Sequence, residues 1–232
     1  HRRDFTINTM ALRLDGRHYG DLYDYWGGLS DLNQGLVRVL HSLSFVDDPT
    51  RLLRAVRFEQ RFGFRIEART RELMDGALPL LRQVSGDRLR HEINLILCED
   101  HPAAMFAALH ELELLNAIHP ELEWEARAAP LLDSVLNQPP DNGWELPEKL
   151  GSLDRKQALG YLVWLSALPA ESIRAIGDRL RFPRVLHSAL EETNALWKEL
   201  PALRGARSGA PRRAVSLRRL RLRAVLQCRR GR

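Results

Sequence analysis

From Asp48 to about residue 200 the sequence is a nearly continuous series of helix signals, and this series constrains the fold most. Asp48-Pro49 is typical of a helix start, with Asp as the N-cap and Pro at the first helical position, where its missing N–H costs nothing. We expect that helix to run to about Phe62 and to end at Gly63. Further helices are predicted over 67–81, 85–98 (with Ser85 as the cap), 102–115, 126–136, 154–166, 169–180 and 183–200.

The first forty residues are instead predicted to form a small β region. Residues 4–14 are rich in β-branched and aromatic positions, and Asp15-Gly16 is a hairpin turn signal. Residues 18–25 are predicted to return as a second strand before Gly27-Gly28, and residues 35–40 to form a third. The predicted fold class is therefore mostly α, a short β region followed by a helical array.

Composition excludes several classes of protein. The two cysteines, Cys98 and Cys228, have neither the number nor the spacing of a disulfide framework or a zinc site, which favours a reducing cytoplasmic location. No apolar run approaches the ~18 residues needed to cross a bilayer, so no membrane association is expected. Residues 138–151, with Pro139-Pro140 and Asn142-Gly143, are predicted to be a linker or long loop.

The excess positive charge lies in one tail. The chain carries 35 Lys and Arg against 30 Asp and Glu, a net charge of +5, and residues 201–232 contain eleven Arg and no acid. The high overall basicity is therefore weak evidence for a nucleic-acid-binding face on a folded domain. This Arg-rich tail is interpreted either as a phosphate-binding segment or as out-of-frame sequence, and disorder is compatible with both.

Three segments follow one another within the first 58 residues and carry most of the functional information. They are Arg2-Arg3-Asp4-Phe5-Thr6-Ile7-Asn8, then Gly27-Gly28-Leu29-Ser30-Asp31-Leu32 followed by Arg38, and then Phe45-Val46-Asp47-Asp48-Pro49-Thr50-Arg51-Leu52-Leu53-Arg54-Ala55-Val56-Arg57-Phe58. Their order and spacing resemble the class II tRNA nucleotidyltransferase and bacterial poly(A) polymerase family, template-independent enzymes that build RNA 3′ ends. The strong resemblance covers residues 1–66, and a weaker one continues through 85–92 and 119–122.

The third segment has a physical interpretation of its own. On a helix that starts at Pro49, the 100° step places Arg54, Arg57 and Arg61 on one stripe with Arg51 at its edge, opposite a buried side of Leu52, Leu53 and Val56. A guanidinium on a rigid helix can meet a base edge with two donors, and a nearby carboxylate can accept from an exocyclic amine. The alternative is that Asp48 is only an N-cap, while Arg51 and Arg54 pair with acids such as Asp47.

The resemblance implies a nucleotide-binding role for six residues, namely Arg2, Arg3, Asp4, Asp48, Arg51 and Arg54. It implies that Asp48 and Arg51 read the base of ATP or CTP through Watson–Crick-like contacts, and that Arg54 steers the base or a phosphate. It implies that Arg2, Arg3 and Asp4 contact the ribose and the triphosphate. For Arg2 and Arg3 the alternative is disorder at a chain terminus.

Two further groups of residues are assigned by their local pattern and by the resemblance. Gly27, Gly28 and Asp31 predict a tight turn with positive φ followed by an Asx-type hydrogen bond. The resemblance implies that this stretch, together with Asp24, is a hinge, although Tyr25 stands where the family has Pro. A further pair, Arg88 and Glu92, has i, i+4 spacing and forms either a simple ion pair or, by resemblance, support for the base-reading helix.

The resemblance also implies two Mg²⁺ ions, held by an Asp-x-Asp pair that precedes the Arg-Arg-Asp segment and follows a Gly-rich turn. The β region contains no such pair, and the scattered histidines His91, His101, His110 and His119 lack ligand spacing. We therefore assign no catalytic residue and no metal ligand in this chain, and expect the chain to lack the catalytic part of the head domain and to be inactive alone. Incorporation of labelled ATP or CTP into tRNA by the purified chain would contradict this expectation.

The resemblance finally implies a domain order and a function. Residues 1–40 are expected to be the end of the nucleotidyltransferase head, 41–122 a helical neck that selects the base and binds RNA, 123–200 a helical body that binds tRNA, and 201–232 the tail. The expected activity is addition of CMP or AMP, from CTP or ATP, to the 3′ end of the tRNA acceptor arm. The alternatives are an enzyme that adds only the terminal A, a poly(A) polymerase, and a non-catalytic helical RNA-binding module.

Overall fold

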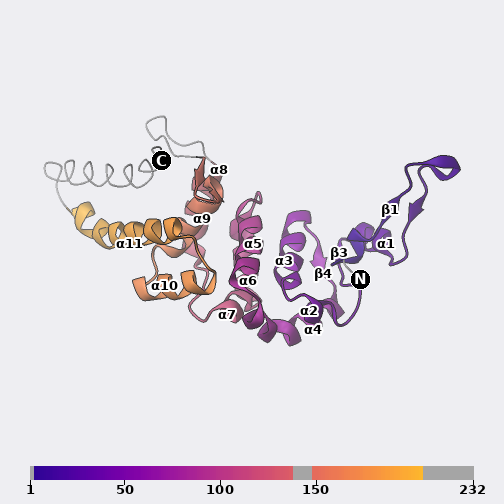
Figure 1. Ribbon diagram of the computed structural model, residues 1–232, viewed down its shortest axis with the longest axis horizontal. Helices are drawn as coiled ribbons and strands as arrows, with labels where there is room; N and C mark the ends of the chain where they lie inside the picture. The colour runs from indigo at the N-terminus through magenta and orange to yellow at the C-terminus, as the bar shows by residue number, and fades with distance from the viewer. Residues whose placement is uncertain (1–2, 138–147, 206–232) are drawn as a thin grey trace. The chain divides into compact units, whose positions relative to one another are not determined.

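The computed structural model describes residues 3–137 and 148–205, and the chain divides into two compact units, residues 1–124 and 125–232 (Figure 1). The described residues are mostly helical, which confirms the predicted fold class. In the first unit the α-helices are α1 (Gly28–Gln34), α2 (Ser44–Asp47), α3 (Arg51–Phe62), α4 (Ala68–Ala77), α5 (Gly86–Leu97), α6 (Pro102–Glu111) and α7 (Leu114–Ile118). Among the described residues, no helix is long and apolar enough to cross a membrane.

The chain begins with a short hairpin, shown in indigo in Figure 1. Strand β1 (Ala11–Leu12) pairs antiparallel with β2 (Leu22–Tyr23), and a 3₁₀ turn, Gly16–His18, lies between them. The predicted hairpin is therefore present, but its strands have only two residues each. The predicted strand over 4–14 is wrong for residues 6–8, which form a 3₁₀ helix.

A local hydrogen-bond network explains that 3₁₀ helix. The Asp4 carboxylate accepts from the backbone N–H of Phe5 and from the side-chain amide of Asn8, so it stabilises a turn that competes with strand pairing. Phe5 still forms one isolated antiparallel bridge with Val39, and its side chain is fully buried. The first residues of the chain are thus held against the segment that follows β3 (Leu36–Val37).

A parallel strand pair encloses the helix that the sequence singled out. Strand β3 pairs with β4 (Arg65–Ile66), with Leu36 opposite Arg65 and Val37 opposite Ile66. The chain between them contains α2 and α3, and α3 ends at Gly63, which has the predicted left-handed conformation (φ 63°). Both ends of the α2–α3 segment are therefore fixed in space by β3 and β4.

Helix α3 begins later than predicted. Its N-cap is Thr50 and its first residue is Arg51, whereas Asp48 has an extended backbone (φ −150°). The Asp48 carboxylate nevertheless accepts from the Thr50 N–H at 3.0 Å and from the Thr50 hydroxyl at 2.7 Å. Asp48 thus closes a turn just before the helix, and its side chain remains at the helix entrance.

The buried faces of α3, α5 and α6 form the core of the first unit, and the three helices pack on one another. Their fully buried side chains include Leu52, Leu53, Leu89, Ile93, Phe106 and Leu109. The predicted inward side of α3 is therefore confirmed by burial. Helix α4 is followed by a 3₁₀ helix, Leu78–Gln83, and α5 has Ser85 as its N-cap, as predicted.

The second unit is a small helical array. It contains a 3₁₀ helix, Ala126–Ala128, followed by α8 (Ala129–Asn137), the antiparallel pair β5 (Lys149–Leu150) and β6 (Leu153–Asp154), α9 (Arg155–Leu165), α10 (Ala170–Arg179) and α11 (Arg184–Gly205). Helix α9 begins with a capping box between Asp154 and Gln157. The buried Asn194 on α11 donates to the carbonyls of Ser166 and Leu168, both at 2.7 Å, and so ties α11 to the end of α9. Residues 138–147 of the predicted linker and 206–232 of the tail lie outside the described residues.

Candidate functional site

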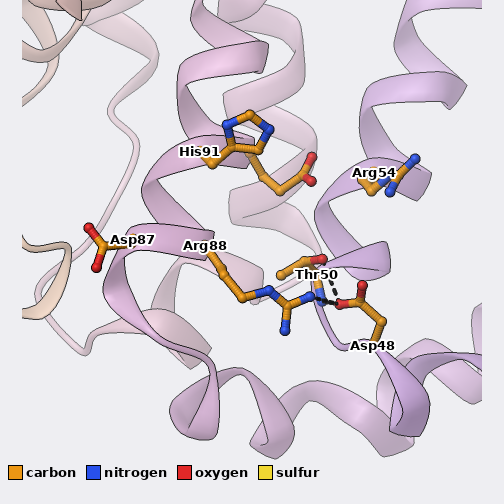
Figure 2. Close-up of a pocket in the computed structure, with 7 residues that line it drawn as sticks. Asp48, Thr50, Arg54, Asp87, Arg88 and His91 are labelled. Carbon is orange, nitrogen blue, oxygen red and sulfur yellow. Dashed lines mark hydrogen bonds and ion pairs between the residues drawn. The ribbon is translucent and has the colours of Figure 1, made fainter. Parts of the chain in front are cut away.

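A pocket of about 390 Å³ lies between the N-terminal turns of α3 and α5 in the first unit (Figure 2). This volume is within the range of small-ligand sites, roughly 300–1,000 Å³. Its lining residues are Asp48, Thr50, Arg54, Asp87, Arg88, His91 and Glu92, and we call it the α3–α5 pocket. It brings together four residues that the sequence had singled out from two separate segments, Asp48, Arg54, Arg88 and Glu92.

Asp48 is held in the pocket by contacts that converge on one of its oxygens. Its Oδ1 accepts from the N–H and hydroxyl of Thr50 and from Arg88 Nη2 at 2.7 Å, so these contacts leave Oδ2 unused (Figure 2). Burial raises the pKa of Asp48, but the Thr50 hydrogen bonds and the Arg88 charge outweigh burial and lower it below its usual 3.8. The site therefore presents an ionised carboxylate that can accept a hydrogen bond.

Arg88 reaches across from α5 to α3 and does not form the simple i, i+4 pair with Glu92 that its spacing allowed. Its guanidinium contacts Asp48 Oδ1 at 2.7 Å, 40 residues away in sequence. Because this contact fixes the Asp48 side chain, Arg88 holds the turn that precedes α3. About half of the Arg88 side chain is exposed, so it can also contact a ligand.

Arg51 lies inside the protein and does not line the pocket. It is 6% exposed, and its Nη1 donates to the carbonyl of Ser44 at 3.0 Å. The sequence placed Arg51 at the edge of an exposed stripe, and that placement is wrong because α2 packs against the first turn of α3 and covers it. In this conformation Arg51 anchors α2, which directly precedes Asp48.

The other arginines of α3 pair with acids, although not with Asp47. Arg54 Nη2 lies 2.5 Å from Oδ2 of the buried Asp4, and Arg61 Nη1 lies 3.5 Å from Glu99 Oε1. Arg57 Nη1 donates to Glu99 Oε1 at 3.1 Å. Of this stripe only Arg54 reaches the α3–α5 pocket.

The Arg-Arg-Asp segment is divided by the structure. Asp4 is buried at 4% exposure and contacts Phe5, Asn8 and Arg54, so it joins the start of the chain to α3 and does not line the pocket. Arg3 is exposed. Arg2 lies outside the described residues.

The four predicted hinge residues form a fixed corner around α1. The Asp24 carboxylate accepts from the backbone N–H groups of Gly28 (2.8 Å) and Leu29 (2.9 Å), and these bonds lower its pKa. Gly27 has positive φ (72°), as predicted, whereas Gly28 is the first residue of the helix. The Asx-type contact is therefore made by Asp24, and the expectation that Asp31 makes it is wrong.

Asp31 instead joins three separate segments. Its Oδ2 accepts from the Thr6 hydroxyl at 2.6 Å and from Arg38 Nε at 3.0 Å, and it is almost completely buried. Arg38 Nη1 in turn lies 3.3 Å from Glu67 Oε1, at the N-cap of α4. This chain of contacts connects the start of the chain, α1 and α4.

The described residues do not fit a Mg²⁺ site. Within 3–137 and 148–205, no three His, Cys, Asp or Glu side chains come together in a way that could hold a metal ion. In the α3–α5 pocket, Asp48 contacts Arg88, and Asp87 contacts Arg90 at 2.8 Å. Chemically, the pocket offers carboxylate acceptors and guanidinium donors to a polar ligand.

Three pocket residues were not predicted from the sequence, namely Thr50, Asp87 and His91. Thr50 lies two residues after Asp48, where a hydroxyl can bond back to a carboxylate, and this Asx-type spacing could have identified it. His91 follows Arg88 by three residues and therefore shares its face of α5. Asp87 carried no sequence signal beyond its place in the first turn of a predicted helix.

Comparisons with known proteins match two parts of the chain to family models. Residues 1–38 match the poly A polymerase head domain, and residues 63–125 match the probable RNA and SrmB-binding site of polymerase A. The chain is 45% identical over 137 residues to a protein of Geobacter sulfurreducens named A-adding tRNA nucleotidyltransferase, covering 58% of this chain and 16% of that protein. It is 46% identical over 121 residues to a protein of the same name from Halalkalibacterium halodurans, covering 50% of this chain and 28% of that protein.

Solved structures agree with these matches. A CCA-adding enzyme in complex with ATP superposes with a TM-score of 0.71 at 37% identity, covering 87% of this chain and 47% of that chain. The Thermotoga maritima CCA-adding enzyme in complex with tRNA gives a TM-score of 0.68 at 37% identity, covering 87% and 48%. The chain thus spans about half the length of these structures and a smaller share of the two relatives named above. The matches confirm the resemblance on which the sequence analysis relied.

Proposed function

We infer that this chain, whose head and RNA-binding segments resemble those of the class II tRNA nucleotidyltransferases, selects the nucleotide for template-independent addition of CMP or AMP to tRNA 3′ ends. The observation that carries this proposal is the ionised carboxylate of Asp48 in the α3–α5 pocket, held by Thr50 and Arg88 through one oxygen. The second oxygen can accept from the exocyclic amine of adenine or cytosine. Guanine and uracil carry a carbonyl acceptor at that position, which a carboxylate repels.

Arg51 is the second residue proposed to read the base. In the present conformation its guanidinium is committed to the Ser44 carbonyl, so direct reading requires Arg51 to leave α2 and turn toward the pocket. While it remains there, Arg51 fixes the segment that carries Asp48. Base selection depends on Arg51 in either conformation. Arg51 touches the nucleotide only when it turns toward the pocket, and it acts indirectly while it remains bound to Ser44.

The remaining proposed contacts concern the ribose and the phosphates. Arg54 lines the α3–α5 pocket, and its partial exposure allows it to steer a base or a phosphate while it remains paired with Asp4. Arg2, Arg3 and Asp4 are proposed to act on the ribose and the triphosphate. The burial of Asp4 supports an indirect role, through the position of Arg54, in the conformation described.

The domain organisation proposed from the resemblance assigns the head to 1–40, the neck to 41–122, the body to 123–200 and the tail to 201–232. We propose the tRNA acceptor arm as the RNA partner, since the similar structures include a tRNA complex, and ATP and CTP as substrates, since they include an ATP and a CTP complex. The names of the relatives, which refer to tRNA, support a cytoplasmic location. The corner formed by Asp24, Gly27, Gly28 and Asp31 is proposed to lie where the head meets the neck. The Mg²⁺ expected for this chemistry has no site among the described residues.

A poly(A) polymerase is a second candidate, because both matching family models are described in terms of poly(A) polymerase. The two candidates differ in the RNA end that they prefer. A tRNA ending in CC should compete for binding to the chain better than an oligoadenylate of equal length if the first candidate is correct, and worse if the second is.

The proposal is tested by nucleotide binding to the purified chain. Saturation-transfer NMR with ATP, CTP, UTP and GTP should detect weak binding and should show a preference for ATP or CTP. The Asp48→Asn variant should lose roughly tenfold or more of that preference, because a good base contact contributes about 1–3 kcal/mol of discrimination. Asp47→Asn is the matched control, since Asp47 is the neighbouring acid, contacts His41 at 3.6 Å and does not line the pocket. Equal binding of all four nucleotides by the unmodified chain would contradict the proposal.

A further inference from the structure

The β1–β2 hairpin exposes large apolar side chains on one of its faces. Leu12 and Leu22 lie opposite each other in the strand pair, and they are 57% and 46% exposed. Leu14, two residues beyond Leu12, is 71% exposed. Alternate residues of a strand point to the same face, so these three leucines form one apolar surface, which we call the hairpin leucine face. A two-stranded hairpin is marginally stable alone and gains stability when another element joins it.

The outer edge of the first strand of this hairpin is free to pair. Arg13 directs both of its backbone groups toward the second strand, because its N–H donates to the Asp21 carbonyl at 3.0 Å and its carbonyl accepts from the Gly20 N–H at 2.9 Å. Successive residues of an antiparallel strand direct their backbone groups to opposite edges, so those of Leu12 and Leu14 point away from the second strand. Within residues 3–137 and 148–205, the sheet has only two strands and no residue hydrogen-bonds to the backbone of Leu14. An open edge of this kind is a template for a further strand.

The charges beside this edge are complementary to themselves. Arg13 and Asp15 flank Leu14, and Arg13 Nε lies 3.1 Å from Asp15 Oδ1 in an exposed pair that contributes little within one chain. When two copies pair antiparallel about a twofold axis at Leu14, Arg13 of each copy lies opposite Asp15 of the other copy. An axis at Arg13 would instead place two arginines opposite each other, which is unfavourable. The charges therefore favour the register centred on Leu14.

We propose that the outer edge of β1 and the hairpin leucine face form a self-association surface, whose partner is a second copy of this chain. The two hairpins join into a four-stranded antiparallel sheet, in which the leucines of both copies pack side by side on one face. Backbone hydrogen bonds and leucine contacts supply the affinity, and the Arg13–Asp15 contacts between copies fix the register. None of these residues lines the α3–α5 pocket, so the inference is independent of the proposed function.

Charge reversal tests the contacts between copies. Sedimentation velocity of the full purified chain should show a monomer–dimer equilibrium over about a hundredfold range of concentration. Arg13→Asp and Asp15→Arg each place two like-charge pairs in a twofold dimer, so each should raise the dissociation constant roughly tenfold or more. An equimolar mixture of the two variants brings opposite charges together again between copies and should associate as the unmodified chain does. Each variant keeps like charges within its own chain, so restoration on mixing can come only from contacts between copies.

Disulfide trapping tests the register. In a background with Cys98→Ser and Cys228→Ser, Leu14→Cys should form a covalent dimer under mild oxidation, because the two copies of residue 14 would have Cα atoms roughly 5.5 Å apart. Leu12→Cys is the control, since the two copies of residue 12 would lie roughly 14 Å apart in the same register.

A matched pair of leucines separates this surface from general surface hydrophobicity. Leu14→Lys should abolish the dimer, because a lysine at the twofold axis faces its own copy, whereas Leu43→Lys, at another exposed leucine (59%), should leave the dimer in place. Circular dichroism confirms that each variant is folded. A monomer at every concentration, no restoration on mixing the two charge variants, or equal trapping at residues 12 and 14 would overturn the inference. So would a dimer that persists in Leu14→Lys, because another surface would then join the copies.

Discussion

Arg54 Nη2 lies 2.5 Å from Oδ2 of Asp4, so a residue at the start of the chain directly holds a residue of the α3–α5 pocket. Asp4 is almost completely buried, and its other oxygen accepts from the Phe5 N–H and the Asn8 amide. These contacts hold the Asp4 carboxylate in one position. The position of the Arg54 guanidinium depends on it.

The first prediction concerns this ion pair. Asp4→Asn should lower the free energy of local unfolding of α3 by about 2 kcal/mol, less than the roughly 3–5 kcal/mol for breaking a fully buried pair, because a third of the Arg54 side chain is exposed. Hydrogen exchange of the α3 amides measures this energy. Asp15→Asn, in the exposed Arg13–Asp15 pair, should change it by less than about 0.5 kcal/mol. Equal effects of the two substitutions would show that burial does not strengthen the Asp4–Arg54 contact.

The second prediction concerns the pKa of Asp48. Arg88→Met removes a charge and a hydrogen bond that lower this pKa and leaves the burial that raises it, so the pKa of Asp48 should rise. A folded-state pKa below the usual value contributes stability that is present at neutral pH and is lost as pH falls through that pKa. At neutral pH, Arg88→Met should therefore lose part of the folding stability that the Asp48 carboxylate contributes. Carbon-13 NMR titration of the Asp48 carboxyl group measures its pKa. The control is Arg90→Met, which removes a contact of Asp87 and should leave the pKa of Asp48 unchanged.

The third prediction concerns two glutamates with opposite shifts. Burial raises the pKa of Glu92 above its usual 4.5, against the charges of Arg54 and Arg57. A raised pKa contributes stability that is present below the unfolded-state value and is lost as pH rises through the folded-state value. Glu92→Gln should thus become more stable relative to the unmodified chain as pH rises above about 4.5. Urea unfolding over a series of pH values measures this difference.

Glu67 is the control for that experiment. Burial also raises its pKa, but hydrogen bonds from the Thr70 N–H and hydroxyl outweigh burial and lower it. Glu67→Gln should therefore become less stable relative to the unmodified chain as pH rises toward about 4.5, below the pH range in which the Glu92 effect appears. If the stability of both variants relative to the unmodified chain changed with pH in the same direction, Glu67 and Glu92 would not have the opposite environments that the structure shows.

The fourth prediction concerns two helical glycines. A Cβ on Gly28 would lie 2.4 Å from the Thr6 carbonyl oxygen, closer than real contacts allow, whereas a Cβ on Gly76 in α4 would meet nothing within 4 Å. Gly28→Ala should displace α1 from the start of the chain and destabilise the first unit. Gly76→Ala should stabilise it by roughly 0.5–1 kcal/mol, because alanine restricts the unfolded chain and favours helix. Thermal unfolding of both variants gives the comparison, and a neutral Gly28→Ala would show that α1 can shift freely.

Helices with clear end signals were predictable from the sequence. Ser85 precedes α5, Gly63 ends α3 in the left-handed conformation, and Asp154 begins α9 with a capping box, so each helix end lies at a residue type that favours it. Helix α1 was missed because its seven residues carry only a weak apolar pattern. What stabilises α1 is Asp24 at its start and the contacts of Asp31 with Thr6 and Arg38, which come from other parts of the chain.

The site was predictable in part, for a physical reason. Spacing in the sequence identified Asp48 and Arg54 on one segment and Arg88 and Glu92 on another, and the packing of α3 against α5 brings these residues together. Helical periodicity could not show that Arg51 turns inward, because the cover over it comes from α2, a four-residue helix with no periodic signal. The domain boundaries and the functional roles of these residues remain predictions.

The pairing of β3 with β4 makes residues 36–66 a topological loop that is closed by backbone hydrogen bonds at its base. Because the two strands hold the ends of this loop together, an intact peptide chain within the loop is not needed to keep its parts in contact. A single cut at the exposed Leu43, between β3 and α2, should therefore leave two pieces that remain associated and still present Asp48 beside Arg88. The segment proposed to select the base is in that sense an insert, whose shape is fixed by its two anchored ends more than by the connection that leads into it.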